Sequence, residues 1–507
     1  MIIRNITGGN YRRYPDKIAV ISGETRYTYK QLHERTNRLA NALFALGMKK
    51  GDILSVFADL CPQYPEVLCM SVKTGIALAP YMISTAPDDL TYLLNNCKSK
   101  VVIFAEQYHK IFDALRPELK YVEKFICIGK HKHPSQNYED LIASFPSSEP
   151  NLVNISYDDL CYVGASSGTT GRPKQTMRTY ENSLSASLQI CYALDIGSED
   201  VFFQPCVVSF GIGAWRVLFH LGVTCILPNT FTPEVVLETI QREKITKIFA
   251  TANLIRELIN YDNVNLYDTS TVKRIWVTGA PLSKEEWVQA IDIFGSVFVQ
   301  AYSTAEQSPV AILQPKDFIL DSKSEKVKRL QSCGQESIDS RVRIIDENGN
   351  DVKPGEIGEI ITEGGALIKG YLNAPNETKE AIRDGFLHTG DLGRMDKDNF
   401  IYLLGRKKEA IIIDGKTVLP YEVEFLLLSH PFVIGAVVIG IPDDIHGHKI
   451  LGIVIKKGNV SQNELIALCK NNLNEYAIPS QIEFVQSYPK TASGKVMKYK
   501  LIEQYNK

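Results

Sequence analysis

Apolar residues in the first 130 positions recur with two different spacings. Leu32, Leu39 and Leu43 follow the spacing of one helix face, which predicts an amphipathic helix. The continuous apolar run at residues 53–57 then predicts a buried strand. Residues 101–128 repeat the alternation of strand and helix. The pattern therefore predicts αβ layers around a hydrophobic core.

The later part of the chain changes its pattern twice. Residues 129–157 are polar and contain Pro-Ser clusters, so they predict a connector. Beyond the connector, residues 160–163 predict a strand and residues 180–194 a helix. Between about 320 and 400, short strands alternate with evenly spaced turns, which is typical of a small β-barrel. From Arg406 onward the pattern predicts a smaller αβ domain.

Length and composition narrow the class of protein. The chain has 507 residues, 44% hydrophobic and 22% charged, as is typical of a globular protein with several compact units. The formal net charge of −2 and the lack of basic runs argue against nucleic acid as a partner. The N-terminus lacks a signal-peptide pattern, and the longest apolar run, residues 432–441, is far shorter than the roughly 20 residues that cross a bilayer. We expect no integral membrane segment.

The cysteines and histidines give no sign of a metal site. All ten cysteines are scattered singly, without a Cys-x-x-Cys pair or a histidine spacing that suggests zinc. We therefore expect reduced thiols in a cytoplasmic protein, and we assign no histidine a ligand role.

The densest polar chemistry lies in residues 166–174, Ser-Ser-Gly-Thr-Thr-Gly-Arg-Pro-Lys, between a predicted strand and a predicted helix. Glycines let the backbone bend so that N–H groups point inward, hydroxyls add donors, and Lys174 adds a positive charge, as suits a polyphosphate. The ordinary P-loop is excluded, because Pro173 separates Gly171 from Lys174. On the loop alone, a surface turn without chemistry is the alternative.

The run Ser-Gly-Thr-Thr-Gly-x-Pro-Lys resembles the signature of the adenylate-forming (AMP-binding) superfamily, which includes acyl- and aryl-CoA synthetases. Further segments resemble that family in the same order and cover almost the whole chain: residues 14–17, 51–52, 73–75, 275–282, 297–306, 389–391, 404–408 and 489–495. The resemblance implies an α/β fold with two parts. Residues 1–405 would form an N-terminal AMP-binding domain of two αβ subdomains plus a small β-barrel, and residues 406–507 a mobile C-terminal α+β lid.

The resemblance also implies a role for each matching residue. Lys495 would be the catalytic lysine at the α-phosphate, and Glu306 would hold Mg²⁺ against the ATP phosphates. Lys408 would be the hinge of the lid, and the turn at Gly415 would line the path of the thiol. The residues expected to bind ATP or AMP are Ser166, Ser167, Gly168, Thr169, Thr170, Gly171, Lys174, Gly279, Ala280, Pro281, Ala301, Tyr302, Ser303, Ala305, Asp391 and Arg406.

Two carboxylates among these residues suit the roles that the resemblance implies. For each of them a simpler explanation without a ligand is the alternative. One carboxylate with phosphate oxygens and waters is an adequate Mg²⁺ shell, although Glu306 alone also fits a solvated loop residue. The Asp391 carboxylate is suited to accept both ribose hydroxyls. A simple surface ion pair between Asp391 and Arg406 is the alternative.

In this family the segment after Pro205 forms one wall of the acyl pocket, so the resemblance places Val208, Ser209, Phe210 and Gly211 there. No acidic residue occurs between positions 205 and 221. A buried ammonium group without a carboxylate partner is costly. We therefore expect an apolar fatty or aromatic acid rather than an α-amino acid.

Four positions depart from the usual family pattern. Ser303 replaces a glycine, and Ala305 replaces a threonine whose hydroxyl usually contacts the α-phosphate. Gln175 replaces a glycine after the loop lysine, and Val208 replaces a histidine. Aryl-acid ligases of siderophore pathways also carry alanine at the position of Ala305, so activity is not excluded.

Together these features predict an ATP-dependent acid–CoA ligase that uses ATP, Mg²⁺ and coenzyme A. It would activate a small carboxylic acid as acyl-AMP with release of pyrophosphate, then transfer the acyl group to the CoA thiol. One alternative is an acyl- or aryl-AMP ligase that loads an acyl carrier protein. A second alternative is a phosphotransferase. It is disfavoured because the loop lacks the Gly-Lys-Ser/Thr motif of the ordinary P-loop. A non-catalytic nucleotide-binding relative is a third, disfavoured by the presence of Lys495, Glu306 and Asp391.

Overall fold

The computed structural model describes residues 6–130, 135–151, 153–165, 172–205, 212–228, 230–321, 323–443, 445–489 and 496–506. These residues form two compact units. The first unit holds the chain up to residue 165 together with residues 173–341 and 363–387, and the second holds residues 342–362 and 388–507. The predicted domain boundary at 405/406 stays a prediction.

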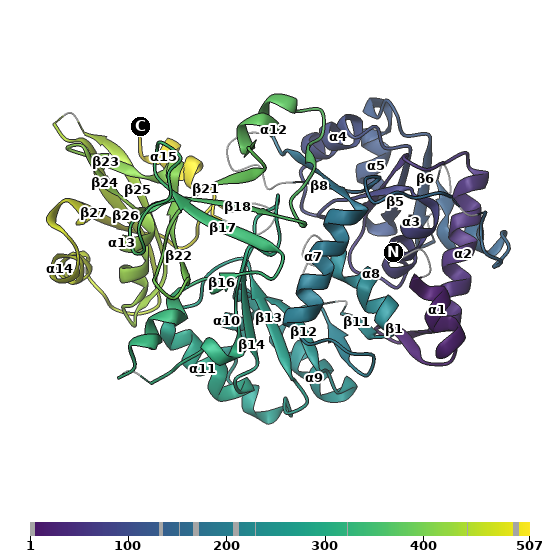
Figure 1. Ribbon diagram of the computed structural model, residues 1–507, viewed down its shortest axis with the longest axis horizontal. Helices are drawn as coiled ribbons and strands as arrows, with labels where there is room; N and C mark the ends of the chain where they lie inside the picture. Colours follow the sequence, from purple (N-terminus) through teal and green to yellow (C-terminus); the bar gives the residue numbers. More distant parts are fainter. Residues whose placement is uncertain are drawn as a thin grey trace. The chain divides into compact units, whose positions relative to one another are not determined.

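The first unit contains an eight-stranded sheet in the order β19-β9-β8-β4-β3-β5-β6-β7 (Figure 1). Its central strands are parallel, whereas β9 runs antiparallel to both β8 and β19. The predicted strand at 53–57 is confirmed as β3, and all five of its residues are buried. The strands are β3 (Ile53–Phe57), β4 (Ala77–Pro80), β5 (Val101–Ala105), β6 (Lys124–Ile128), β7 (Gln136–Asn137), β8 (Leu160–Ala165), β9 (Gln175–Thr179) and β19 (Gly370–Tyr371).

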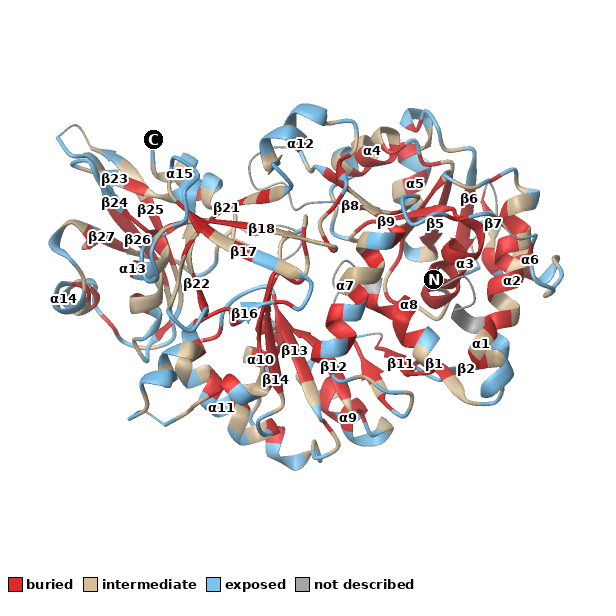
Figure 2. Cartoon of the chain, viewed as in Figure 1, coloured by how far each residue is buried: buried red, intermediate tan, exposed pale blue. Residues whose placement is uncertain are grey.

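A nine-stranded sheet in the order β16-β15-β14-β13-β12-β10-β11-β1-β2 forms the other half of this unit. Figure 2 colours its parallel strands β12, β13 and β14 largely as buried, as expected where helices cover a parallel sheet. The strands are β1 (Ile18–Ser22), β2 (Thr25–Thr28), β10 (Val201–Phe203), β11 (Thr224–Leu227), β12 (Lys247–Thr251), β13 (Arg274–Thr278), β14 (Phe298–Tyr302), β15 (Ala311–Leu313) and β16 (Gln335–Glu336).

Local capping fixes where several helices of the first unit begin. The Thr28 and Thr179 side chains each accept a backbone N–H from the third residue of the helix that follows, in a capping box. The helices are α1 (Ile6–Arg13), α2 (Tyr29–Ala45), α3 (Gln63–Thr74), α4 (Pro87–Asn96), α5 (His109–Leu115), α6 (Tyr138–Ala143), α7 (Tyr180–Ala193), α8 (Ile212–Leu221), α9 (Pro233–Glu243), α10 (Ala252–Ile259), α11 (Lys284–Phe294) and α12 (Pro375–Ala381). No helix among the described residues is long and apolar enough to cross a membrane.

A five-stranded antiparallel sheet takes the place of the predicted barrel, and a smaller αβ assembly follows it. The five strands are β17 (Ser340–Ile345), β18 (Gly358–Gly364), β20 (Ile382–Arg383), β21 (Phe386–Met395) and β22 (Ile401–Arg406). The αβ assembly after β22, all of it in the second unit, comprises β23 (Ile411–Ile413), β24 (Lys416–Val418), α13 (Pro420–Leu428), β25 (Val433–Asp443), β26 (Gly447–Lys456), α14 (Gln462–Asn472), β27 (Gln481–Phe484) and α15 (Lys498–Tyr505).

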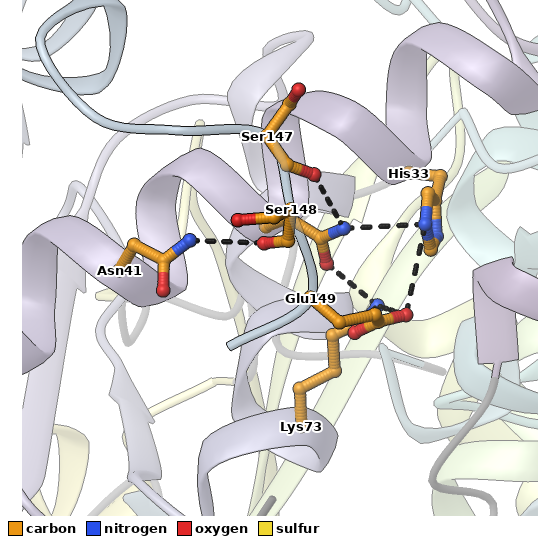
Figure 3. Close-up of polar contacts among 7 residues, drawn as sticks. His33, Asn41, Lys73, Ser147, Ser148 and Glu149 are labelled. Carbon is orange, nitrogen blue, oxygen red and sulfur yellow. Dashed lines mark hydrogen bonds and ion pairs between the residues drawn. The ribbon is translucent and has the colours of Figure 1, made fainter. Parts of the chain in front are cut away.

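The predicted polar connector at 129–157 is more ordered than its sequence indicates, since it includes β7 and α6. The stretch after α6 is held by side chains of α2. Asn37 donates to the carbonyl of Ser147 at 2.9 Å, and Asn41 donates to the carbonyl of Pro146 at 3.0 Å. Asn41 also donates to the carbonyl of Ser148 at 3.0 Å (Figure 3). Side-chain amides thus replace the strand partners that this backbone lacks.

A buried lysine completes this network. Lys73, 7% exposed, donates to Asn37 Oδ1 at 2.7 Å and to both Glu149 carboxylate oxygens at 2.9 Å. His33 Nε2 lies 3.6 Å from the same carboxylate (Figure 3). Burial lowers the pKa of His33 to about 4, and the charge of Lys73 acts in the same direction. His33 is therefore neutral at pH 7.

We expect the first unit to lose stability between pH 6.5 and about 4. Unfolded His33 takes up a proton near pH 6.5, whereas the folded protein resists it down to about pH 4. The stabilisation is therefore complete above pH 6.5 and is lost as the pH falls through this window. Denaturant unfolding at a series of pH values should give a weaker pH dependence for His33→Gln. The control His109→Gln, at another histidine of this unit, should keep the wild-type profile; equal profiles for all three proteins would contradict the prediction.

Candidate active site

The carboxyl end of β14 carries a tight turn that presents Glu306. Tyr302 ends the strand and is buried. In the turn, the Thr304 N–H donates to the Gln307 carbonyl at 2.9 Å, and the Gln307 N–H donates to Thr304 Oγ1 at 2.9 Å. Thr304 is therefore engaged within the turn. The turn lies at the edge where parallel α/β sheets commonly bind ligands.

Two segments distant in sequence meet at Glu306. The Tyr371 hydroxyl donates to Glu306 Oε1 at 2.7 Å, and Lys174 Nζ lies 5.0 Å from the centroid of the Tyr371 ring. Tyr371 belongs to β19, and it pairs with Thr176 of β9, two residues after Lys174. The structure thus brings together two predicted site residues, Lys174 and Glu306. Tyr371 joins them, although nothing in its sequence context pointed to the site.

Arg178 is a second residue that the sequence did not single out. Its guanidinium donates to the carbonyls of Ala305 at 2.9 Å and Ala366 at 3.2 Å. Burial lowers the pKa of Arg178, and the nearby charge of Glu306 opposes that shift. Arg178 therefore fixes the turn that carries Glu306. Its position four residues after Lys174 was the signal available in the sequence.

The structure gives Gln175 a role in the core. Its side chain is buried, and its amide nitrogen donates to Tyr81 Oη at 2.9 Å and to the Leu93 carbonyl at 3.3 Å. Its amide oxygen accepts from Asn96 at 2.7 Å. Gln175, which stands where the family usually has a glycine, therefore fits into the core beneath the eight-stranded sheet. Its side-chain amide makes three hydrogen bonds there.

The predicted adenine-side residues follow the neighbouring strand β13. Gly279, Ala280 and Pro281 are exposed, and Gly279 has a φ of +98°, a conformation that favours glycine. The Thr278 hydroxyl donates to the carbonyl of Ala301 on β14 at 3.4 Å. Because β13 and β14 are parallel, their carboxyl ends place these residues at the same edge as Tyr302.

In the second unit, Asp391 and Arg406 pair directly across β21 and β22. Asp391 is 5% exposed, and its Oδ1 lies 2.9 Å from Arg406 Nε. Arg406 also donates to the carbonyl of Thr389 at 2.9 Å. The structure therefore joins the two residues predicted to hold the ribose in an ion pair, and the ribose role itself stays a prediction.

The predicted hinge and thiol-path residues lie nearby in the second unit. Lys408 is exposed in a short 3₁₀ turn, Lys407–Glu409, directly after β22. Asp414 and Gly415 join β23 to β24, with φ values of 49° and 75°. Two residues with positive φ make the tight hairpin turn that Asp-Gly sequences favour. Among the described residues, no group apart from its chain neighbours lies within 4 Å of where a Cβ on Gly415 would stand.

Several predicted residues lie outside the described part of the chain: Ser166, Ser167, Gly168, Thr169, Thr170, Gly171, Val208, Ser209, Phe210, Gly211 and Lys495. The residues that flank the segment 490–495 are well anchored. The Met497 N–H donates to the Pro489 carbonyl at 2.8 Å. Lys498 Nζ lies 2.8 Å from Glu424 Oε1 and 2.9 Å from Glu409 Oε2. Burial opposes a charge on Lys498, but these two carboxylates raise its pKa.

The described residues contain no cluster of three or more histidine, cysteine or acidic side chains that suits a metal ion. Glu306 offers a single half-buried carboxylate, with one oxygen bound by Tyr371 and the other without a hydrogen-bond partner among the described residues. Such a site fits Mg²⁺ that takes most of its ligands from phosphate and water, and it does not fit an all-protein metal cage.

Comparison with known proteins shows the family of the chain. The family model described as AMP-binding enzyme matches residues 9–372, and that of the AMP-binding enzyme C-terminal domain matches residues 422–495. A feruloyl-CoA synthase of Amycolatopsis sp is 28% identical over 96% of both chains. A putative acyl-CoA synthetase of Bacillus subtilis, YngI, is 29% identical over 97% of this chain and 94% of that one.

The fold has a close match among solved structures. The anthranilate CoA ligase AuaEII, solved in complex with anthranoyl-AMP, superposes with a TM-score of 0.90 at 23% identity, over 99% of this chain and 97% of that one. The likeness shows the adenylate-forming fold, with a large N-terminal region and a small C-terminal domain. From the family models and their extent, the chain belongs to the AMP-binding enzymes, the family that its loop and strand motifs predicted.

Proposed function

We propose that the protein is an ATP-dependent acid–CoA ligase that forms an acyl-adenylate. The observation that carries the proposal is the convergence of Lys174, Tyr371 and Glu306 at the carboxyl end of the parallel strands. An ammonium group over the ring of one tyrosine and a carboxylate bound to the hydroxyl of the same tyrosine suit a nucleotide polyphosphate and its cation. Relatives named as feruloyl-CoA synthase and acyl-CoA synthetase support an acid as substrate and CoA as acceptor.

In the first half-reaction, an oxygen of the substrate carboxylate attacks the α-phosphorus of ATP, and the bond to pyrophosphate breaks. Negative charge grows on the non-bridging oxygens, so a positioned ammonium group lowers the barrier. Lys495 supplies that charge, and Lys174 with its loop holds the β- and γ-phosphates. Mg²⁺ beside Glu306, when bound, offsets the charge of the phosphates.

Tyr371 and Arg178 act on Glu306 rather than on the substrate. The Tyr371 hydroxyl fixes one carboxylate oxygen, and Arg178 holds the backbone of the same turn. Together they orient the remaining oxygen before the nucleotide arrives, which reduces the ordering cost of binding.

In the second half-reaction, the thiol of CoA attacks the acyl carbonyl carbon and AMP leaves with its electron pair. The C-terminal domain rotates about Lys408, so that Lys495 departs and the Gly415 turn faces the thiol path. Asp391 and Arg406 hold the ribose. The substrate is an apolar fatty or aromatic acid, because the segment 205–221 contains no carboxylate to pair with an ammonium group.

We expect ATP to be converted to AMP and pyrophosphate only when a suitable acid and Mg²⁺ are present. A panel of acids should give the fastest pyrophosphate release with fatty or aromatic acids, and α-amino acids should react far more slowly. Mass spectrometry should then find an acyl-CoA thioester when CoA is added. ADP as the nucleotide product would rule out the proposal, and transfer only to a carrier protein would replace CoA as the acceptor.

Tyr371→Phe should slow adenylate formation by about tenfold or more and raise the Mg²⁺ concentration needed for half-maximal rate. The substitution removes one hydrogen bond to a charged group, worth about 1.5–3 kcal/mol. Tyr402→Phe is the matched control, because the Tyr402 hydroxyl also donates to a carboxylate, Asp396, at 3.0 Å in the second unit. Rates of pyrophosphate release that fall equally in both variants would count against a specific role for Tyr371.

Lys495→Ala and Gly415→Trp should fail in different half-reactions. Removing a group that stabilises developing charge costs on the order of 10²–10³ in rate, so Lys495→Ala should lose adenylation but still convert a supplied acyl-adenylate. Gly415→Trp should form the adenylate and fail to transfer it to CoA. Gly349→Trp controls for backbone strain, since Gly349 has a φ of 83° and open space around its Cβ position. If Lys495→Ala and Gly415→Trp lost the same half-reaction, the proposal that the C-terminal domain takes two positions would be contradicted.

A further inference from the structure

The turn that follows β13 is an exposed piece of backbone with an arginine on one of its carbonyls. Gly279, Ala280 and Pro281 are exposed, whereas the next residue, Leu282, is buried. An exposed turn has little packing to fix its backbone, so its conformation depends on hydrogen bonds. Arg256 of α10 supplies one of them, because its Nη2 donates to the Pro281 carbonyl at 2.5 Å. The helix after β12 thus reaches the turn after β13.

The guanidinium of Arg256 is held in place by partners on two helices. Its Nε donates to Glu286 Oε1 at 2.7 Å, and its Nη2 lies 3.5 Å from Glu286 Oε2. Its Nη1 donates to Asn253 Oδ1 at 3.2 Å. All three nitrogens of this rigid, planar group therefore have partners, which fixes the direction in which it meets the turn.

The carboxylate of Glu286 is in turn fixed by the start of α11. The Ser283 N–H donates to Glu286 Oε2 at 2.6 Å, and the Glu286 N–H donates to Ser283 Oγ at 3.1 Å, in a capping box. The same carboxylate therefore caps α11 and orients Arg256. The resulting network encloses the turn between α10 and the first residues of α11.

The neighbouring turn at the same edge of the sheet is held in a similar way. Arg178 donates to the carbonyl of Ala305 at 2.9 Å and so fixes the turn of Glu306. The two turns differ in what they carry. The turn held by Arg178 presents the carboxylate expected at Mg²⁺, whereas the turn held by Arg256 consists of the residues expected beside adenine. The two arginines thus support different parts of a bound nucleotide.

We propose that Arg256, oriented by Glu286, is a positioning residue that sets the affinity of the site for the base of the nucleotide. The inference rests on the proposed function, because that function places adenine at this turn. The Arg256 and Glu286 side chains are 34% and 24% exposed, so solvent partly screens the pair and its loss has a moderate effect. A contact to the base is the same in the ground state and the transition state, so its loss raises KM and leaves kcat unchanged.

Pyrophosphate release with the best acid of the panel gives the first test. Arg256→Met should raise the KM for ATP about threefold to tenfold and change kcat by less than about twofold. Calorimetry with AMP, which contains the base, should show the same loss of affinity. Inhibition by tripolyphosphate, which has the phosphates without the base, should be unchanged, whereas a general loss of structure would weaken both.

Two further variants show whether the effect belongs to this network. Arg26→Met is the matched control, since Arg26 Nη2 lies 2.8 Å from Glu243 Oε1 on the edge strand β2, and it should keep the KM and the AMP affinity of the wild type. Glu286→Gln keeps a side chain that suits the capping box and removes the charge beside Arg256, so it should give a smaller loss in the same direction. Arg256→Met combined with Glu286→Gln should be no worse than Arg256→Met alone, because both act through one contact.

Three results would overturn the proposal: unchanged KM and AMP affinity in Arg256→Met, an equal loss of tripolyphosphate inhibition, or the same rise of KM in Arg26→Met. A wild-type protein that neither binds AMP nor releases pyrophosphate would overturn the proposed function, and this inference with it. That result is recognised before any substitution is made, so the two failures are distinct.

Discussion

The pairing of β9 with β8 on one side and β19 on the other is the contact on which the candidate site depends. The strand β9 begins directly after Lys174, and its pairing with β19 brings Tyr371 beside that lysine. Side chains alternate along a strand, so Gln175 and Arg178 lie on opposite faces. Gln175 enters the core beneath the sheet, whereas Arg178 holds the turn of Glu306. One five-residue strand thus serves both the core and the site.

Charge compensation is the second constraint on the first unit. The network of Lys73, Glu149 and Asn37 ties the segment after α6 to two helices, and burial, helped by the charge of Lys73, lowers the pKa of His33 beside it. This network gives fixed partners to the backbone of a segment that is rich in serine and proline. Arg216 is the buried cation for which the chain supplies no such partner.

The second unit is organised by ion pairs that join segments distant in sequence. Asp391 and Arg406 connect β21 with the end of β22, next to the predicted hinge. Lys498, at the start of α15, reaches Glu409 and Glu424, so the residue after Lys408 is tied to the same body as the C-terminal helix. These contacts tie the turn at Glu409 and the helix α13 to the start of α15.

The sequence by itself determined the family, the α/β class and the position of several elements, because these depend on spacing along the chain. The strand expected at 53–57 is β3, and the helix expected at 180–194 is α7, Tyr180–Ala193. The helix α6 inside the expected connector was missed, since six residues are too few for a clear period. Only the tertiary structure decided that Tyr371 bonds Glu306 across 65 positions, that Gln175 enters the core, and that Arg216 has no carboxylate beside it. Such contacts depend on which strands and helices become neighbours, and local spacing carries no record of that.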